Sequence, residues 1–325
     1  MNLNGVDIPV LTYLSDQHFV SSKQLSSQLG FSRVAVWKQI QKLKKIGYHI
    51  SADARKGYQI ISRPDILLPT EIYRNLQTKY IGRQIFYHKQ VTSTNCMVKE
   101  SIKDKNMYFR EGAVMIADLQ TAGRGRLGRN WYSPHGGIWL TIVLFPNLEP
   151  VYIAKITLMT AVALVQSIKR LYRISVQIKW PNDLISGNRK LCGILTEMAA
   201  ESDRINYVLA GIGINANMQR QEFPEDIREQ SISLQEILGG SVSRIKLVQV
   251  LLENFENYYD RLQKKQFESI LEEWKENSDT LGKNIVINSA GQTISGKAVD
   301  LTPEGALVIR QKDGKLVNIL SGTLQ

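Results

Sequence analysis

The chain has 325 residues, which is enough for two or three domains of ordinary size. A content of 43% hydrophobic and 22% charged residues excludes a disordered chain, and no run of about 18 consecutive apolar residues predicts a membrane-spanning segment. The net charge of +11 favours a polyanionic partner. Cys96 and Cys192 lack the spacing of a disulfide framework or a metal site, and the N-terminus lacks secretory features. We therefore expect a cytoplasmic protein.

Residues 1–63 are predicted to form a winged-helix domain of three short helices and a hairpin. Leu11 and Leu14 mark the first helix, and Ser21-Ser22 can cap a second helix that stops at Gly30. Ser32 can cap the third helix, whose apolar stripe consists of Val36, Ile40 and Leu43. The short turn between these two helices has helix-turn-helix spacing, and the alternating segment 48–61 turns at Arg55-Lys56-Gly57 as a basic wing.

Positive charge is concentrated in this segment, because residues 1–63 hold nine Lys and Arg against three Asp. We therefore expect DNA binding by the exposed side of the third helix, the helix starts and the wing. The residues predicted to contact DNA are Ser22, Ser32, Arg33, Val34, Trp37, Lys38, Gln41 and Lys56. Lys42, Lys44 and Lys45 would face the flanking phosphates. The alternative is a helical interaction module whose lysines are only solvated.

Strands and helices are intermixed from residue 70 to about 275, after a proline-containing linker at residues 63–69. Thr70 is expected to cap a helix. The predicted strands are Gln84–His88, Ala113–Asp118, Ile138–Phe145, Val176–Lys179, Gly193–Met198 and Val208–Ile214, and the predicted helices are Thr94–Lys103, Ile153–Leu171 and Ile245–Trp274. Short connections, such as a hairpin turn at Gly187-Asn188, favour an α+β fold with a mixed, mostly antiparallel sheet. Residues 280–325 alternate without a helical period and predict a small β-barrel.

A loop rich in arginine and glycine, residues 120–129, is the most unusual stretch. Gly123, Gly125 and Gly128 satisfy the dinucleotide fingerprint, but the following residues 129–137 cannot form the helix that such a site requires. Arginines between glycines instead place permanent cations on a mobile backbone that can close over phosphate. A flexible basic surface loop and a nucleic-acid contact are the alternatives.

A second stretch, residues 179–184, ends a strand and enters a hairpin whose returning arm spans residues 189–195. Hairpin geometry can bring Lys190 near Asp183 and toward the arginine loop. A lysine there can neutralise charge that develops on phosphorus as a carboxylate attacks. An ordinary surface ion pair is the alternative.

Two further stretches are candidates for ligand contacts. Ser93-Thr94-Asn95 begins a helix, where short polar side chains and free backbone N–H groups can hold a urea or a carboxyl group, or can simply cap the helix. The segment 211–215, Gly-Ile-Gly-Ile-Asn, has glycines on one face of a strand. Such glycines indicate close packing by a flat ligand or by a neighbouring helix.

Together these four stretches, in this order, resemble the biotin–protein ligase family: Ser93-Thr94-Asn95, GRGRLGR over 123–129, KWPNDL over 179–184 with RKLCGIL over 189–195, and GIGIN over 211–215. With the winged helix in front, the chain looks like the bifunctional bacterial type, a ligase and biotin-operon repressor in one polypeptide. The resemblance implies a class II synthetase-like core and an SH3-like C-terminal barrel. Its domains would span residues 1–63, 70–275 and 280–325.

The resemblance also implies a reaction in two steps with biotin, ATP and Mg²⁺. Biotin is activated as biotinyl-5′-adenylate and then acylates a lysine of a biotin carboxyl carrier protein. The implied biotin contacts are Ser93, Thr94, Asn95, Gln120, Arg124, Gly125, Arg126 and Lys190. The implied ATP contacts are Arg124, Arg126, Trp131, Asn182, Asp183 and Lys190, with Lys190, Arg126 and Asp183 as the catalytic set. Metal ligands are not assigned.

Repression in this family joins the two activities. Bound adenylate would order loops and favour a homodimer that presents two winged helices to operator DNA. Two alternatives stay open from the residues alone: a biotin sensor without catalysis, and a ligase whose head binds protein instead of DNA. The intact Lys190, Asp183 and arginine loop argue against the pure sensor.

Overall fold

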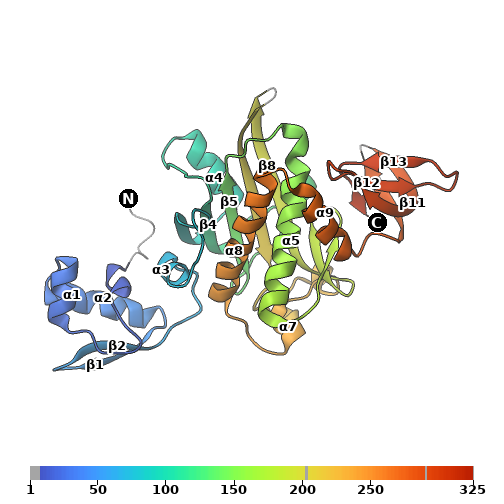
Figure 1. Cartoon of the computed structure of the whole chain (residues 1–325). Coiled ribbons are helices and arrows are strands. Elements are labelled where there is room, and N and C mark those ends of the chain that lie inside the picture. The colour runs from blue at the N-terminus through green and yellow to red at the C-terminus, as the bar shows by residue number, and fades with distance from the viewer. Residues whose placement is uncertain (1–7, 202–203, 290, 325) are drawn as a thin grey trace. The chain divides into compact units, whose positions relative to one another are not determined.

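The computed structural model describes residues 8–201, 204–289 and 291–324. The chain divides into two compact units, unit 1 (Met1–Arg74) and unit 2 (Asn75–Gln325). Figure 1 shows helices and a small hairpin in unit 1, and sheets with packed helices in unit 2. Residues 1–7, which belong to the N-terminus that we expect to lack secretory features, lie outside the described residues.

Unit 1 contains the predicted helix-turn-helix. Its elements are the 3-10 helix η1 (Pro9–Thr12), α1 (Ser22–Leu29), α2 (Arg33–Lys45), β1 (His49–Asp53), β2 (Gly57–Ser62) and α3 (Pro69–Tyr73). Ser21 caps α1 in a capping box with Gln24, and Ser32 caps α2, so both expected helix starts are confirmed. The expected first helix is a short 3-10 helix. It begins at Pro9, and Tyr13 is its C-cap.

The hairpin β1–β2 is the predicted wing, with its turn at Arg55 and Lys56. Val20 exchanges backbone hydrogen bonds of 2.8 and 2.9 Å with Tyr58, which fixes the wing beside the start of α1. A Cβ on Gly57 would lie 2.1 Å from the Val20 carbonyl oxygen, and its φ is +105°. Glycine is therefore required at the point where the wing meets the helical part of unit 1.

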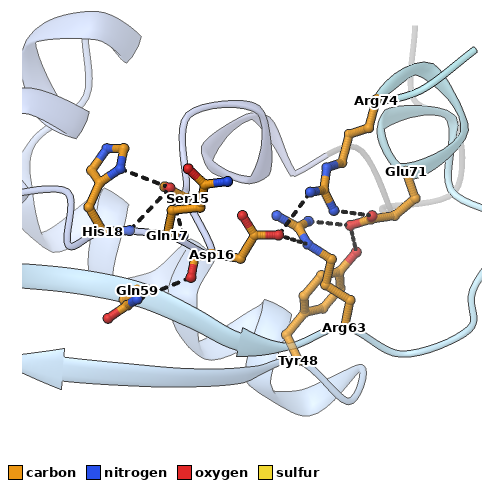
Figure 2. A network of polar contacts seen from close by, with 9 residues as sticks. All are labelled: Ser15, Asp16, Gln17, His18, Tyr48, Gln59, Arg63, Glu71 and Arg74. Atoms are coloured by element: carbon orange, nitrogen blue, oxygen red, sulfur yellow. Dashed lines mark hydrogen bonds and ion pairs between the residues drawn. The ribbon is translucent and has the colours of Figure 1, made fainter.

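A buried carboxylate joins α3 to the wing (Figure 2). Glu71, only 3% exposed, accepts a 2.6 Å hydrogen bond from the Tyr48 hydroxyl and a 2.7 Å bond from Arg63. Arg74 donates to Asp16 at 2.9 Å and lies 3.5 Å from Glu71. Burial, followed by the hydrogen bond to Glu71, raises the pKa of Tyr48. Residues 63–74 thus pack as part of unit 1.

Unit 2 is built on a seven-stranded sheet with the order β3-β4-β5-β9-β8-β7-β6. The strands are β3 (Ile85–Val91), β4 (Ala113–Gln120), β5 (Ile138–Leu144), β6 (Gln177–Lys179), β7 (Asp183–Ser186), β8 (Arg189–Glu201) and β9 (Arg204–Ile214). Among the pairs of strands described for this sheet, β3 and β4 are the one parallel pair, so the expected mixed, mostly antiparallel sheet is confirmed. In the register of β9 with its neighbours, Gly211 lies between Thr141 and Leu195, and Gly213 lies opposite Gly193. Because alternate residues of a strand point to the same side, all of these residues lie on one face of the sheet.

Helices cover both faces of this sheet. The helix α4 (Thr94–Lys103) packs on β4, β5 and β9, and α5 (Ile153–Tyr172) packs on the opposite face with α8 (Arg244–Gln263) and α9 (Phe267–Glu276). Among the described residues, Pro150–Tyr172 alone is long and apolar enough to cross a membrane by length and composition. Because 61% of its apolar window is buried inside the structure, packing in the core accounts for that composition. The short helices α6 (Glu225–Arg228) and α7 (Leu234–Leu238) and the 3-10 helices η2 (Arg126–Gly128), η3 (Pro150–Tyr152) and η4 (Arg220–Glu222) lie in the connections.

Two predictions in this region are wrong. Thr70 does not cap α3; Leu68 occupies the N-cap position without a side-chain hydrogen bond, and Pro69 begins the helix. The single helix expected over 245–274 is two helices, α8 and α9. The chain turns between them at Lys265, whose φ of +60° is incompatible with a continuing helix.

The C-terminal part of unit 2 is a five-stranded antiparallel sheet with the order β13-β12-β11-β10-β14. Its strands are β10 (Asn284–Ser289), β11 (Gln292–Leu301), β12 (Leu307–Arg310), β13 (Leu316–Ile319) and β14 (Thr323–Leu324). The predicted all-β C-terminal domain is thus confirmed as an antiparallel sheet, and its last strand, β14, pairs with β10.

Candidate active site

One cavity of about 590 Å³ lies on the α4 face of the seven-stranded sheet. The structure brings every residue predicted to contact biotin or ATP to its lining: Ser93, Thr94, Asn95, Gln120, Arg124, Gly125, Arg126, Trp131, Asn182, Asp183 and Lys190. These residues come from stretches of the chain that lie as far apart as positions 93 and 190. The motifs that are far apart in the sequence therefore form one site.

The arginine-glycine loop connects β4 to the Trp131 segment and forms one side of this cavity. It is closed on itself by backbone hydrogen bonds from Gly125 to Arg129, 2.7 Å, and from Trp131 to Gly123, 2.8 Å. Within the short η2 turn, Leu127 has a left-handed φ of +56° and is 76% exposed. Residues held in the left-handed region cluster at ligand-binding loops and active sites, which agrees with the place of this turn beside the cavity.

Arg126 points from this loop across the cavity. Its guanidinium donates to the Asn182 side-chain oxygen at 3.1 Å and to the Gly322 carbonyl at 3.3 Å. Burial lowers the pKa of Arg126, and the carboxylate of Asp183 opposes that shift. Because arginine stays protonated even so, a fixed positive charge stands at the centre of the site.

The hairpin of β7 and β8 supplies a second cation. The Lys190 ammonium lies 2.8 Å from an Asp183 carboxylate oxygen and 5.0 Å from the centre of a Trp131 ring. Both backbone groups of Lys190 are held by the segment 230–232, through hydrogen bonds of 2.6 and 3.0 Å. The predicted approach of Lys190 to Asp183 is confirmed, and the pair lines the cavity instead of the open surface.

Ser93, Thr94 and Asn95 stand at the first turn of α4 and are each at most 4% exposed. Gln120 accepts the Thr94 backbone N–H at 2.8 Å and donates to Ser133 at 2.8 Å. Ser93 occupies the N-cap position without a side-chain cap hydrogen bond. The start of α4 is therefore a row of buried polar groups that face the cavity.

The glycines of β9 leave room for two cavity residues. A Cβ at Gly211 would lie 2.6 Å from the Asn95 side-chain oxygen, and one at Gly213 would lie 2.4 Å from the Trp131 indole nitrogen. That indole N–H is buried against the strand and has no hydrogen-bond partner among the described residues. The close packing expected at this strand is thus made by two side chains that line the cavity.

Charge in the cavity is strongly one-sided. Its lining includes the cations Arg124, Arg126, Arg129, Lys179 and Lys190, and Asp183 is the one carboxylate among the described lining residues. No cluster of three or more His, Cys, Asp or Glu side chains that would hold a metal ion occurs in the described residues. A divalent ion would therefore fit here only with phosphate oxygens among its ligands.

Several lining residues were not predicted from the sequence. Gly322, Thr323 and Leu324 of the C-terminal sheet reach the cavity, as do Phe223, Ile227, Gln230 and Ser231. Arg129 belongs to the arginine-glycine motif and could have been included on that basis. The others carry no motif, and only the folded chain brings them to the site.

The residues predicted to contact DNA lie in unit 1 and form a separate surface. Arg33, Val34, Trp37 and Lys38 are exposed on one side of α2, while Val36, Ile40 and Leu43 are buried on the other. Gln41 and Ser22 are half-buried, Ser32 is exposed and caps α2, and Lys56 is exposed in the wing turn. Val34 and Trp37, 63% and 51% exposed, make this side unusually apolar for a solvated basic helix.

Comparison with known families agrees with the division of the chain into a winged helix, a cavity-bearing sheet and a C-terminal sheet. The model of the biotin/lipoate A/B protein ligase family matches residues 87–215, and an HTH domain model matches residues 10–59. The biotin protein ligase C-terminal domain model matches residues 280–324. The three matches follow the winged helix, the seven-stranded sheet and the C-terminal sheet.

Similar proteins extend over the whole chain. The bifunctional ligase/repressor BirA of Bacillus subtilis is 37% identical over 95% of this chain and 94% of its own length, and that of Escherichia coli is 28% identical over 100% and 98%. A biotin protein ligase from Aquifex aeolicus, solved with biotin and ATP, matches 75% of this chain and 98% of its own with a TM-score of 0.66 at 27% identity. The chain belongs to the biotin–protein ligase family. Of the relatives named above, both bifunctional ligase/repressors match at least 95% of the chain.

Proposed function

We propose that the chain is a biotin–protein ligase that also represses transcription of biotin genes. The observation that carries this proposal is the cavity in which five cations and one carboxylate meet a row of buried polar groups. The cations suit the phosphates of ATP, and the polar row suits the ureido ring of biotin. Unit 1 adds the DNA-binding surface.

In the first step the biotin carboxylate attacks the α-phosphorus of ATP, a P–O bond to pyrophosphate breaks, and biotinyl-5′-adenylate forms. Arg124, Arg126 and Lys190 bind the phosphate oxygens and neutralise charge that grows on them in the transition state. Asp183, 2.8 Å away, orients the Lys190 ammonium. Trp131 packs against the adenine, and Ser93, Thr94, Asn95, Gln120 and Gly125 bind biotin.

Mg²⁺ accompanies ATP in this proposal. Asp183 and the side-chain oxygen of Asn182 are oxygen ligands beside the cations of the cavity, which suits an ion that takes one or two protein ligands and substrate phosphates. The ion would neutralise phosphate charge when bound. Metal binding at Asp183 has to compete with the Lys190 ammonium.

In the second step the amine of a lysine on a biotin carboxyl carrier protein attacks the adenylate carbonyl, and AMP leaves. The arginine-glycine loop covers the adenylate and keeps water from the mixed anhydride. The adenylate is also the corepressor. Its binding orders loops and favours a homodimer in which two winged helices reach operator DNA, in the cytoplasm.

Biotin-dependent exchange of labelled pyrophosphate into ATP tests the ligase half of the proposal. We expect exchange with biotin and Mg²⁺ and none with lipoate or octanoate. Lys190→Ala should reduce exchange by about a hundredfold or more, because a fixed cation at the reacting phosphate is lost. Circular dichroism and thermal unfolding should show the variant folded.

Lys264→Ala, which removes a lysine at the C-terminal end of α8, is the matched control and should exchange like the wild type. Folded wild-type protein that exchanges no pyrophosphate with biotin would leave a DNA-binding biotin sensor as the better account. Near-normal exchange by Lys190→Ala would remove Lys190 from the catalytic set.

A further inference from the structure

A chain of hydrogen bonds runs from outside the cavity to its floor. Glu197 on β8 accepts from the Lys99 ammonium at 2.6 Å with one carboxylate oxygen and from the Asn95 amide at 2.7 Å with the other. Asn95 contacts Thr141 at 2.5 Å, and Thr141 contacts Thr94 at 2.8 Å. Of these residues, Thr94 and Asn95 line the cavity, whereas Glu197, Lys99 and Thr141 do not.

The carboxylate fixes the orientation of the Asn95 amide. A carboxylate paired with an ammonium group can only accept hydrogen bonds, so the Asn95 group that faces Glu197 must be the NH₂. The carbonyl oxygen of Leu195, 3.4 Å from the same nitrogen, also only accepts and requires the same orientation. The Asn95 oxygen therefore faces Thr141.

This orientation sets the direction of both hydroxyl groups that follow. The Asn95 oxygen carries no proton, so Thr141 donates to it and, with its single proton used, accepts from Thr94. The other hydroxyl contact of Thr94 is to the Gln120 side-chain oxygen at 3.2 Å, which also accepts. In either case the Thr94 proton is used inside the protein.

The orientation of Gln120 is set independently. Ser133 donates its proton to the Trp131 carbonyl at 2.9 Å, so it accepts from the Gln120 NH₂ at 2.8 Å. The Gln120 oxygen then faces Thr94, as the previous step requires. Two separate hydrogen-bond chains thus leave Thr94 with only oxygen lone pairs for a molecule in the cavity.

We propose that Glu197, held by Lys99, is a positioning residue that makes the Thr94 oxygen an obligatory acceptor for a ligand N–H, such as a ureido N–H of biotin. The inference rests on the proposed function for the identity of the ligand. It predicts discrimination against acids such as lipoate or octanoate, which have no N–H donor to offer. A site built to pair an N–H rejects a ligand that lacks it.

Biotin binding to full-length variants tests this role. Glu197→Ala removes the nearer acceptor of the Asn95 amide and leaves only the Leu195 carbonyl, 3.4 Å away, to orient it, so Kd for biotin by calorimetry and KM for biotin should rise about tenfold. KM for ATP should stay within about twofold. Glu201→Ala is the matched control, since Glu201 lies on the same strand and accepts from the Asn206 amide at 2.9 Å, away from the cavity.

A double-mutant cycle separates positioning from folding. Thr141→Val breaks the same chain between Asn95 and Thr94 and should also weaken biotin binding about tenfold. Because both substitutions interrupt the same chain of hydrogen bonds, the affinity of the double variant for biotin should fall about tenfold, not about a hundredfold. If Glu197→Ala does not fold, Thr141→Val with the ATP comparison still tests the chain.

The outcomes are distinct from those of the proposed function. Absence of biotin-dependent exchange in the wild type would count against the ligase itself. If the wild type is active, three results would each overturn the positioning role. The first is unchanged biotin affinity in Glu197→Ala, and the second is a loss of biotin affinity in the double variant equal to the product of the two single losses. The third is an equal rise of KM for biotin and for ATP together with a lower Tm.

Discussion

Gly211 and Gly213 are two residues apart on β9, and each makes room for a different residue of the cavity. Gly211 makes room for Asn95, which belongs to the predicted biotin contacts, and Gly213 makes room for Trp131, which is predicted to pack on adenine. A methyl group at either position would displace one neighbour and leave the other in place. The two glycines therefore allow the two halves of the ligand site to be perturbed separately.

We expect Gly211→Ala to raise KM for biotin about tenfold and to leave KM for ATP nearly unchanged, and Gly213→Ala to do the reverse. The physical reason is overpacking, which typically costs about 1–3 kcal/mol when the neighbour must move. Steady-state pyrophosphate exchange at varied biotin and ATP measures both constants. Gly240→Ala, where no atom lies within 4 Å of the added Cβ, is the control. If both variants raised KM for biotin and KM for ATP equally, the assignment of Gly211 to the biotin contacts and of Gly213 to the ATP contacts would be contradicted.

At this scale the sequence predicts the site well where a motif exists. Lys190, Arg126 and Asn95 stand in recognisable stretches, and the structure places them in one cavity. Glu197 and Thr141 could not be found this way. They are ordinary residues of strands, and only the register of β8 and β5 with β9 brings them beside α4.

At the scale of elements, the predictions succeed where local signals set the boundaries. α1 and α2 begin where serine caps them, because the capping interaction lies within a few residues of the helix start. The sequence between α8 and α9 contains no glycine or proline that would predict the break. Tertiary packing imposes a left-handed turn at Lys265, against its local preference.

Glu71 is the element-scale test of how α3 is held in unit 1. Glu71→Ala leaves Tyr48 and Arg63 without their buried acceptor, and we expect the free energy of opening of the wing to fall by about 2 kcal/mol. Hydrogen–deuterium exchange of peptides from β1 and β2 in the full chain measures this change.

Glu229→Ala provides the comparison, because its ion pair with Arg220 is exposed and should contribute little. Equal protection of β1 and β2 in wild type and Glu71→Ala would show that the buried network does not hold the wing. Faster exchange throughout unit 2 would point to a global effect instead.

The whole molecule separates its two proposed activities between compact units. The two ligase-family models match residues 87–215 and 280–324, all of them in unit 2, so we expect the ligase fold not to depend on the first unit. Because Glu71 and Arg74 pack within unit 1, a cut after residue 74 respects the fold better than one after residue 63.

Removal of residues 1–74 should therefore keep biotin-dependent pyrophosphate exchange within about threefold of wild type, since chemistry and substrate contacts stay in one unit. Binding to duplex DNA from a biotin-gene regulatory region should be lost. In the full chain, that binding should weaken steeply with salt, because phosphate contacts release counterions. Trp37→Ala in the full chain should weaken DNA binding and leave exchange intact. Retained DNA binding by the shortened protein would refute the assignment of unit 1.

The contribution of the C-terminal sheet is the part of the molecule least accessible from sequence. Gly322 contacts Arg126 although 196 residues separate them along the chain, and no motif marks it. A Cβ at this position would lie 2.4 Å from Ile287, so the close approach of β14 to β10 depends on glycine. Contacts at such separation follow from how domains dock, which local patterns do not encode.

This same contact makes the order of synthesis on the ribosome matter. Unit 1 is complete once residue 74 has emerged, whereas the cavity gains the carbonyl that holds Arg126 only after residue 322 has been made. A nonsense mutation within the C-terminal sheet would therefore yield a product with an intact winged helix and an unfinished pocket. Such a product would not form its own corepressor, and without the ligand that favours the dimer it would bind operator DNA more weakly than the full-length protein.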